Sequence, residues 1–103
     1  MNLSDYQDAA VDSAIYSRDY AVTYPILGLV GEAGEVAEKW KKNLRDGVFD
    51  LDEMAKELGD VLWYLANTAN DLGLNLDFIA WQNLDKLADR KARGVLAGNG
   101  DNR

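Results

Sequence analysis

Two pairs of acidic residues are the first feature of this sequence that could carry chemistry. Glu32 and Glu35 are three positions apart, and so are Glu57 and Asp60. A spacing of three places two carboxylates on one face of a helix. Converging carboxylates repel one another unless a cation neutralises them, and an all-oxygen ligand set favours Mg²⁺ or Mn²⁺, or else Ca²⁺. The pairs therefore predict a hard-cation site, and the alternative for either pair is a solvated helix face.

The position of each pair around its helix is more informative than its spacing. Relative to the centre of the apolar stripe of their helices, Glu32 and Glu57 both lie about 90–100° away. Glu35 and Asp60 lie about 60° further round, on the same side. Antiparallel pairing of the two helices across the short connection at 43–52 would bring all four carboxylates together.

Charged residues beside these pairs have two interpretations each. Glu38 and Glu53 lie near the helix faces that carry the two acid pairs, where they are either further ligands or ordinary surface residues. Lys39, Lys41 and Lys42 are either surface charges or contacts for phosphate.

A strip of donors on the last predicted helix is the second candidate site. Asn83, Lys86, Arg90 and Arg93 follow one another at steps of three, four and three, so they share one face. Arginine suits bidentate contact with phosphate, and the alternative is again a solvated face. A carboxylate-held metal together with a cationic strip is the set of parts needed to handle a nucleotide polyphosphate.

Composition excludes several classes of function. The 103 residues include 18 acidic and 11 basic side chains, no histidine and no cysteine, for a formal net charge of −7. A Ser-His-Asp triad, a thiolate zinc site and a disulfide framework are therefore impossible. An acidic chain is a poor ligand for polymeric nucleic acid. We expect a cytoplasmic protein without membrane contact, because the sequence has neither a long apolar run nor the pattern of a signal peptide.

Capping residues and glycines divide the chain into four predicted helices. Ser4 with Gln7 and Asp50 with Glu53 have the spacing of a capping box, and Gly73 is typical of a helix end. The predicted helices span about 5–19, 25–43, 51–72 and 76–93. No segment alternates with the period of a strand. We therefore predict an all-α domain over 1–94, a four-helix bundle completed by homo-oligomerisation, and a flexible tail over 95–103.

Three glycines inside the second predicted helix are unusual. Gly28, Gly31 and Gly34 each cost about 1 kcal/mol of helix stability relative to alanine. Either the helix tolerates them, or another backbone or a ligand approaches closely there.

At these residues the chain resembles the MazG-like nucleoside triphosphate pyrophosphohydrolases, the all-α NTP-PPase superfamily. The resemblance covers residues 25–94 and rests on three segments, LGLVGEAGEVAE, ELGDVLWYL and NLDKLADR. The family pattern is an E-E-x-x-E block followed by E-x-x-D. Glu32 and Glu35 match the block, Gly31 stands where its first glutamate is expected, and Glu57 and Asp60 match E-x-x-D.

The resemblance implies hydrolysis of a nucleoside triphosphate between its α- and β-phosphates, yielding a nucleoside monophosphate and pyrophosphate. It implies Mg²⁺, with Mn²⁺ as the alternative ion, and a homodimer or dimer of dimers with sites near the subunit interface. The metal ligands would be Glu32, Glu35, Glu57 and Asp60.

The resemblance also implies roles on the last helix, where Lys86 and Arg90 would contact phosphates and Asn83 would orient the nucleotide. Glu35 and Glu38 are both candidates for the general base. The competing hypothesis is a catalytically weak helical dimerisation or regulatory protein that retains the fold, and a third is a plain cation binder without chemistry.

Overall fold

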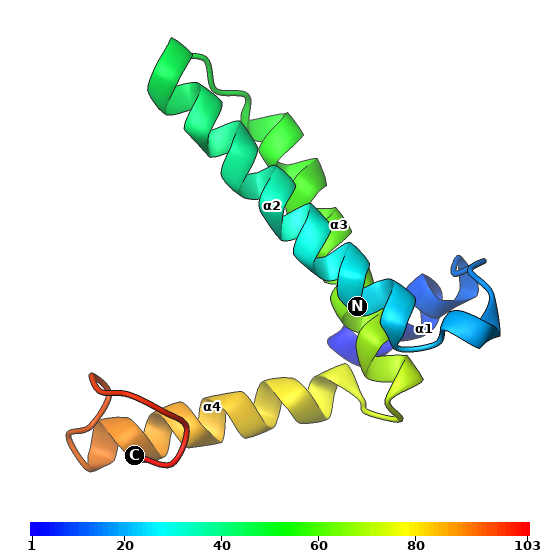
Figure 1. The fold of residues 1–103 in the computed structure, drawn as a ribbon. Helices are drawn as coiled ribbons and strands as arrows, with labels where there is room; N and C mark the ends of the chain where they lie inside the picture. Colours follow the sequence, from blue (N-terminus) through cyan, green and yellow to red (C-terminus); the bar gives the residue numbers. More distant parts are fainter.

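The computed structural model describes all 103 residues, and every regular element in it is helical (Figure 1). This confirms the all-α prediction with its four α-helices. The elements are α1 (Leu3–Asp12), a short 3₁₀ turn η1 (Arg18–Tyr20), α2 (Thr23–Asp46), α3 (Leu51–Asp71) and α4 (Leu76–Ala92).

Local capping explains where α3 and α4 begin and where three helices end. The side chains of Asp50 and Asn75 each accept hydrogen bonds from two amides of the following turn, as the sequence predicts. Gly47, Gly73 and Gly94 follow α2, α3 and α4 with φ of 70°, 74° and 72°. Glycine adopts this left-handed conformation without steric cost, so these residues end the helices.

The predicted capping box at the start of α1 is wrong. The cap is Asn2, whose Oδ1 accepts a hydrogen bond from the Asp5 amide at 2.7 Å, while Asp5 accepts one from the Asn2 amide. Ser4 instead donates to the side chain of Asn75 at 2.9 Å, and Gln7 is buried. Both residues serve the contact of α1 with α4, which local spacing does not reveal.

The predicted end of the first helix, at residue 19, is also wrong, because α1 ends at Asp12. The following segment is held by Asp71 at the end of α3, whose side chain is 1% exposed. Asp71 accepts hydrogen bonds from the Tyr16 hydroxyl at 2.7 Å, from Arg18 at 2.8 Å and from the Val22 amide at 3.0 Å. These tertiary contacts replace further helical turns.

Val22 has a strained backbone at this junction. Its φ is 68° and its ψ is −55°, and the Thr23 amide donates to the Ala21 carbonyl at 2.7 Å across it. This geometry is that of a γ-turn with positive φ, which is rare for a β-branched residue. The hydrogen bond from Val22 to Asp71 helps to hold it.

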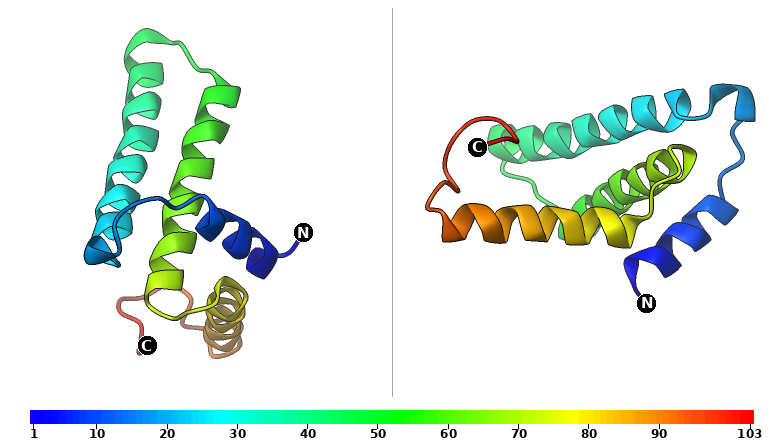
Figure 2. Two further views of the ribbon diagram at one scale, coloured as in Figure 1. Left: turned by 90° about the vertical axis from the view of Figure 1, so that its right-hand side faces the viewer. Right: turned by 90° about the horizontal axis from the view of Figure 1, so that it is seen from below.

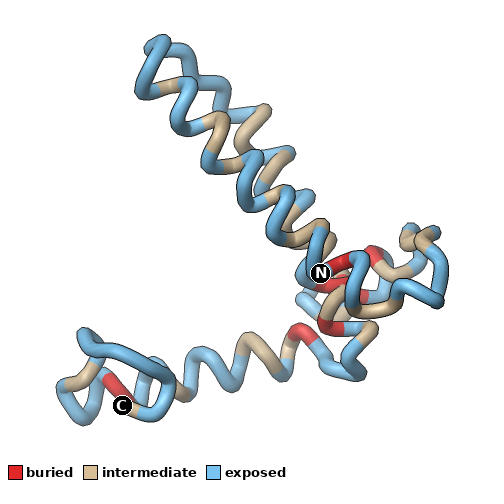
Figure 3. The backbone as a smooth tube through the Cα atoms, viewed as in Figure 1, coloured by how far each residue is buried: buried red, intermediate tan, exposed pale blue.

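The helices meet at one end of the molecule. α2 and α3 form an antiparallel hairpin, and α1 packs across α3 and also contacts α4 (Figure 2). The buried apolar residues lie at that junction (Figure 3), with Tyr6, Trp63 and Ile79 packed against them; they are Ala10, Ala66, Ala69 and Leu76.

The single chain is open. Its radius of gyration is 16.4 Å, whereas a compact chain of this length has about 13 Å. Its accessible surface is 7297 Å², against about 5,800 Å² expected for its mass. α4 runs away from the α2–α3 hairpin (Figure 1), so one chain by itself does not close a four-helix bundle. None of the helices has both the length and the apolar composition needed to span a bilayer.

Candidate functional site

Three carboxylates from α2 and α3 converge in the middle of the hairpin. One oxygen each of Glu32, Glu57 and Asp60 lies within 4.8 Å of the other two. The antiparallel packing of α2 on α3 faces Glu32 toward the other pair, and the i,i+3 spacing keeps Glu57 and Asp60 on one side of α3. The sequence predicts that four carboxylates converge, and the structure brings together these three, without Glu35.

The electrostatics of the cluster favour a bound cation. Partial burial raises the pKa of Glu32 above its usual value, and a hydrogen bond with Glu57 and the nearby charges of Asp60, Glu57 and Glu35 raise it further. The pKa rises because each ionised neighbour opposes the ionisation of Glu32. A cation among these oxygens would remove that repulsion.

The donor set also fits a hard divalent ion. Carboxylate oxygens are the ligands that Mg²⁺ and Mn²⁺ prefer. Adjacent oxygens on Mg²⁺ are about 3.0 Å apart and opposite ones about 4.2 Å apart, so oxygens within 4.8 Å of one another can share one ion after their side chains rotate toward it.

Glu35 and Glu38, the two candidate bases, have different surroundings. Glu35 is exposed on α2 outside the group of three, yet close enough for its charge to raise the pKa of Glu32. Glu38 pairs with Lys41 at 2.9 Å. The hydrogen bond that it accepts from Lys41, together with the charges of Lys41, Lys42 and Arg45, lowers the pKa of Glu38, which makes it a weaker base.

Lys39 is a member of the site that sequence reasoning did not separate from its neighbours. Its Nζ lies 3.3 Å from Glu57 Oε1 and 3.4 Å from Glu53 Oε2, so it links α2 to α3 beside the cluster. The position of Lys39, seven residues after Glu32, places both on the same side of α2 and is the signal that could have identified it.

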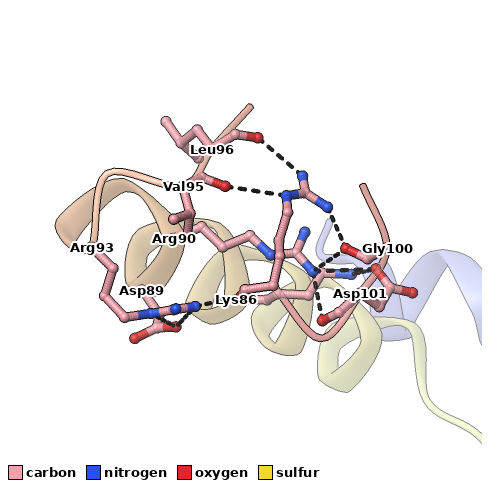
Figure 4. A network of polar contacts seen from close by, with 9 residues as sticks. Lys86, Asp89, Arg90, Arg93, Val95, Leu96, Gly100 and Asp101 are labelled. Atoms are coloured by element: carbon pink, nitrogen blue, oxygen red, sulfur yellow. Dashed lines mark hydrogen bonds and ion pairs between the residues drawn. The ribbon is translucent and has the colours of Figure 1, made fainter. Parts of the chain in front are cut away.

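The second predicted strip has an additional member in this structure, contributed by the tail. Asn83 and Lys86 line a pocket of 490 Å³ together with Ile79, Gln82 and Asp101. Asp101 belongs to the tail that is predicted to be flexible, yet its carboxylate lies 3.0 Å from Lys86 Nζ. Arg90 is buried beneath the tail rather than facing solvent (Figure 4).

The acidic cluster and the donor strip lie apart within one chain. The cluster is on the α2–α3 hairpin, while the strip is on α4, which diverges from that hairpin (Figure 2). A ligand that contacts both must therefore receive one of them by closure of α4 or from another copy of the chain.

Of the three glycines inside α2, only Gly28 is required by a contact. A Cβ at Gly28 would collide with the ring of Tyr64 on α3, whereas Gly31 and Gly34 have nothing within 4 Å of an added Cβ. Close approach therefore explains Gly28 alone.

Comparison with known proteins identifies related sequences. The family model described as the MazG nucleotide pyrophosphohydrolase domain matches residues 23–95, which include both candidate sites except for Asp101. The chain is also similar to the Gene 37 protein of Mycobacterium phage L5, with 47% identity over an alignment that covers all of both chains. No solved structure matches.

Proposed function

Because the chain belongs to the MazG nucleotide pyrophosphohydrolase family, we propose that it hydrolyses a ribo- or deoxyribonucleoside triphosphate between the α- and β-phosphates, releasing a nucleoside monophosphate and pyrophosphate. The observation that carries the proposal is the convergence of Glu32, Glu57 and Asp60, which lie where the family pattern expects metal ligands.

In this proposal Glu32, Glu57 and Asp60 hold Mg²⁺, or Mn²⁺ in its place, and Glu35 is the fourth ligand or a neighbour of the ion. A bound Mg²⁺ would offset the charge of the triphosphate and of the departing pyrophosphate, and it would make a coordinated water more acidic. Lys39 forms a salt bridge with Glu57 and so restricts its carboxylate.

We assign the general base to Glu35 rather than Glu38. The base must accept a proton from water, and the pairing of Glu38 with Lys41 stabilises its ionised form and weakens it as a base. Glu35 is exposed on α2 beside the cluster and, unlike Glu38, forms no salt bridge. Its carboxylate can orient a water molecule and take its proton.

The nucleotide contacts are assigned to α4. The ammonium of Lys86 meets phosphate oxygens and the amide of Asn83 orients the nucleotide, and both residues line the pocket on α4. Arg90 is buried and does not line the pocket, so it adds positive charge from beneath the tail. This division gives the metal to α2 and α3 and the phosphate donors to α4.

We also propose that the working form is a homodimer or a dimer of dimers. Each chain exposes about 1,500 Å² more surface than a compact chain of its mass, which exceeds the roughly 800 Å² per partner of a standard interface. The separation of the cluster from α4 within one chain supports sites that combine elements of two copies.

The proposal is tested by measuring pyrophosphate release from a panel of ribo- and deoxyribonucleoside triphosphates, with Mg²⁺ and with a chelator in its place. We expect release from at least one nucleotide, only when Mg²⁺ is present. A folded protein that releases none from any nucleotide would instead fit a helical dimerisation or regulatory protein that retains the fold.

A plain cation binder makes a different prediction about α4. If the protein only binds metal, Lys86→Ala and Arg90→Ala leave all ligand binding unchanged. If it binds nucleotides as proposed, Lys86→Ala weakens binding of the nucleotide and leaves binding of the metal alone intact.

A further inference from the structure

The C-terminal tail, residues 95–103, folds back along α4 and buries Arg90. The Arg90 side chain is 4% exposed, and its guanidinium donates to the backbone carbonyl of Asp101 at 2.7 Å and to that of Gly100 at 3.4 Å (Figure 4). A buried arginine is stable only when its donors are paired, so these carbonyls are part of its setting. The predicted flexibility of this tail stays a prediction.

The tail is also tied to itself and to the end of α4. Arg103 donates to the carbonyls of Val95 at 3.1 Å and Leu96 at 3.0 Å, and its own carbonyl accepts a hydrogen bond from Arg93 at 2.6 Å. These contacts close residues 95–103 into a loop whose two ends meet. The loop is held independently of the Asp101 carboxylate.

Asp101 is the tail residue that reaches the proposed phosphate contact. Its Oδ1 lies 3.0 Å from Lys86 Nζ and 3.4 Å from the Arg90 guanidinium. Lys86 stays 37% exposed and lines the same pocket as Asn83. An ammonium has three donors, so one bond to Asp101 leaves two for a phosphate.

We propose that Asp101 is a positioning residue for Lys86 and that Arg90, rather than contacting phosphate, anchors the tail that brings Asp101 there. The proposal rests on the proposed function, in which Lys86 contacts phosphate. A lysine side chain is flexible, and ordering it on binding reduces affinity. Asp101 orders Lys86 beforehand, with its ammonium at the pocket.

The opposite role for Asp101 is competition with phosphate, in which the tail blocks Lys86 until it is displaced. The two roles predict opposite changes in phosphate affinity when the charge of Asp101 is removed. Positioning is favoured because the tail is fixed mainly through the Arg90 and Arg103 bonds to backbone carbonyls, which a phosphate at Lys86 does not replace.

The test is the affinity for inorganic tripolyphosphate in the presence of a chelator, measured by calorimetry on the full chain and on Asp101→Asn. Asparagine has the same shape but lacks the charge that holds the ammonium. We expect affinity to fall about two- to tenfold, the cost of ordering one flexible side chain. In a Lys86→Met background the same substitution should have no further effect.

Asp85→Asn is the matched control. Asp85 is exposed on α4 next to Lys86 and forms no salt bridge. The substitution therefore removes one negative charge without freeing the Lys86 ammonium from Asp101. The affinity of Asp85→Asn for tripolyphosphate should equal or exceed that of the unaltered chain.

The proposal is overturned if Asp101→Asn binds tripolyphosphate as tightly as Asp85→Asn or more tightly, or if the unaltered chain binds no tripolyphosphate. Because this readout needs no turnover, nucleotide hydrolysis by the unaltered chain tests the proposed function separately. A rise in KM for the nucleotide with unchanged kcat in Asp101→Asn would link the tripolyphosphate affinity to nucleotide hydrolysis.

Discussion

Glu32, Glu57 and Asp60 form a group whose proximity is unfavourable in the absence of a metal ion, because Lys39 pairs with Glu57 alone among them. Carboxylate oxygens within 4.8 Å repel one another, and the raised pKa of Glu32 reflects partial burial together with that repulsion. If these carboxylates were structural instead, removing the charge of one of them would lower the free energy of unfolding. The site and a structural role can therefore be separated by substitutions that preserve shape.

Asp60→Asn is the clearest such substitution. It removes one ligand charge and relieves repulsion, so we expect turnover with Mg²⁺ to fall at least about a hundredfold while stability without metal holds or rises. Turnover and urea unfolding in a chelator measure the two effects. Asp8→Asn, at an exposed position on α1, is the control for charge alone. A steep fall in metal-free stability would show that the acid is structural and the site wrongly assigned.

Asp71 is a structural carboxylate and predicts a pH dependence of the opposite kind. Burial by itself would raise the pKa of Asp71, but hydrogen bonds from Arg18, Tyr16 and the Val22 amide outweigh it and lower the pKa below 3.8. The unfolded chain therefore binds the proton first as pH falls. The stability contributed by the charge is present above pH 3.8 and is lost as pH falls through the lower folded pKa.

Asp71→Asn should lower the free energy of unfolding by about 2 kcal/mol at pH 7, since it weakens three hydrogen bonds to a buried group. The difference from the unaltered chain should shrink between pH 5 and pH 3. Urea unfolding at fixed protein concentration across that range is the measurement. A difference that stays constant or grows in acid would contradict the assignment of the lowered pKa.

At the scale of elements, the sequence predicts what is determined locally. The starts of α3 and α4 follow from Asp50 and Asn75, whose caps involve only the next turn. The end of α1 does not, because it depends on Asp71, 49 positions beyond Val22. The parts of the candidate sites differ in the same way, because some follow from local spacing and others depend on tertiary contacts. Regular spacing reveals the acid pairs, whereas the contact of Asp101 with Lys86 depends on how the tail folds back.

The contact between α2 and α3 makes its own prediction at Gly28. A Cβ there would strike the Tyr64 ring, so Gly28→Ala should cost about 1–3 kcal/mol of stability, as overpacking does. In a Tyr64→Leu background the same change should be nearly neutral or stabilising, because alanine favours helix once the ring is gone. Urea unfolding of the four chains gives the coupling. Equal effects of Gly28→Ala in both backgrounds would show that the two residues do not touch.

At the scale of the whole molecule, the open shape of the chain is the main observation. α4 exposes large apolar side chains, with Trp81 66% and Leu84 55% exposed, and it does not pack along the α2–α3 hairpin. Monomeric soluble proteins rarely expose an apolar surface of this kind, and oligomerisation is a common way for a small chain to cover it. The proposed homo-oligomer would supply the cover and bring α4 toward the carboxylates.

Light scattering during size exclusion should therefore give a mass of two or four chains, and the midpoint of thermal unfolding should rise with protein concentration. Leu84→Glu places a charge on the exposed face of α4 and should shift the mass toward one chain, with loss of turnover. Asp85→Asn, one position along, should keep the mass and the turnover. A concentration-independent midpoint and a mass of one chain for the unaltered protein would contradict the assembly.

The most direct test of the central claim is the identity of the products. Phosphorus-31 NMR of a nucleoside triphosphate incubated with the protein and Mg²⁺ should show monophosphate and pyrophosphate appearing in equal amounts, and neither without Mg²⁺. Appearance of a nucleoside diphosphate with inorganic phosphate, or a full nucleotide panel left intact by the folded protein, would contradict the account.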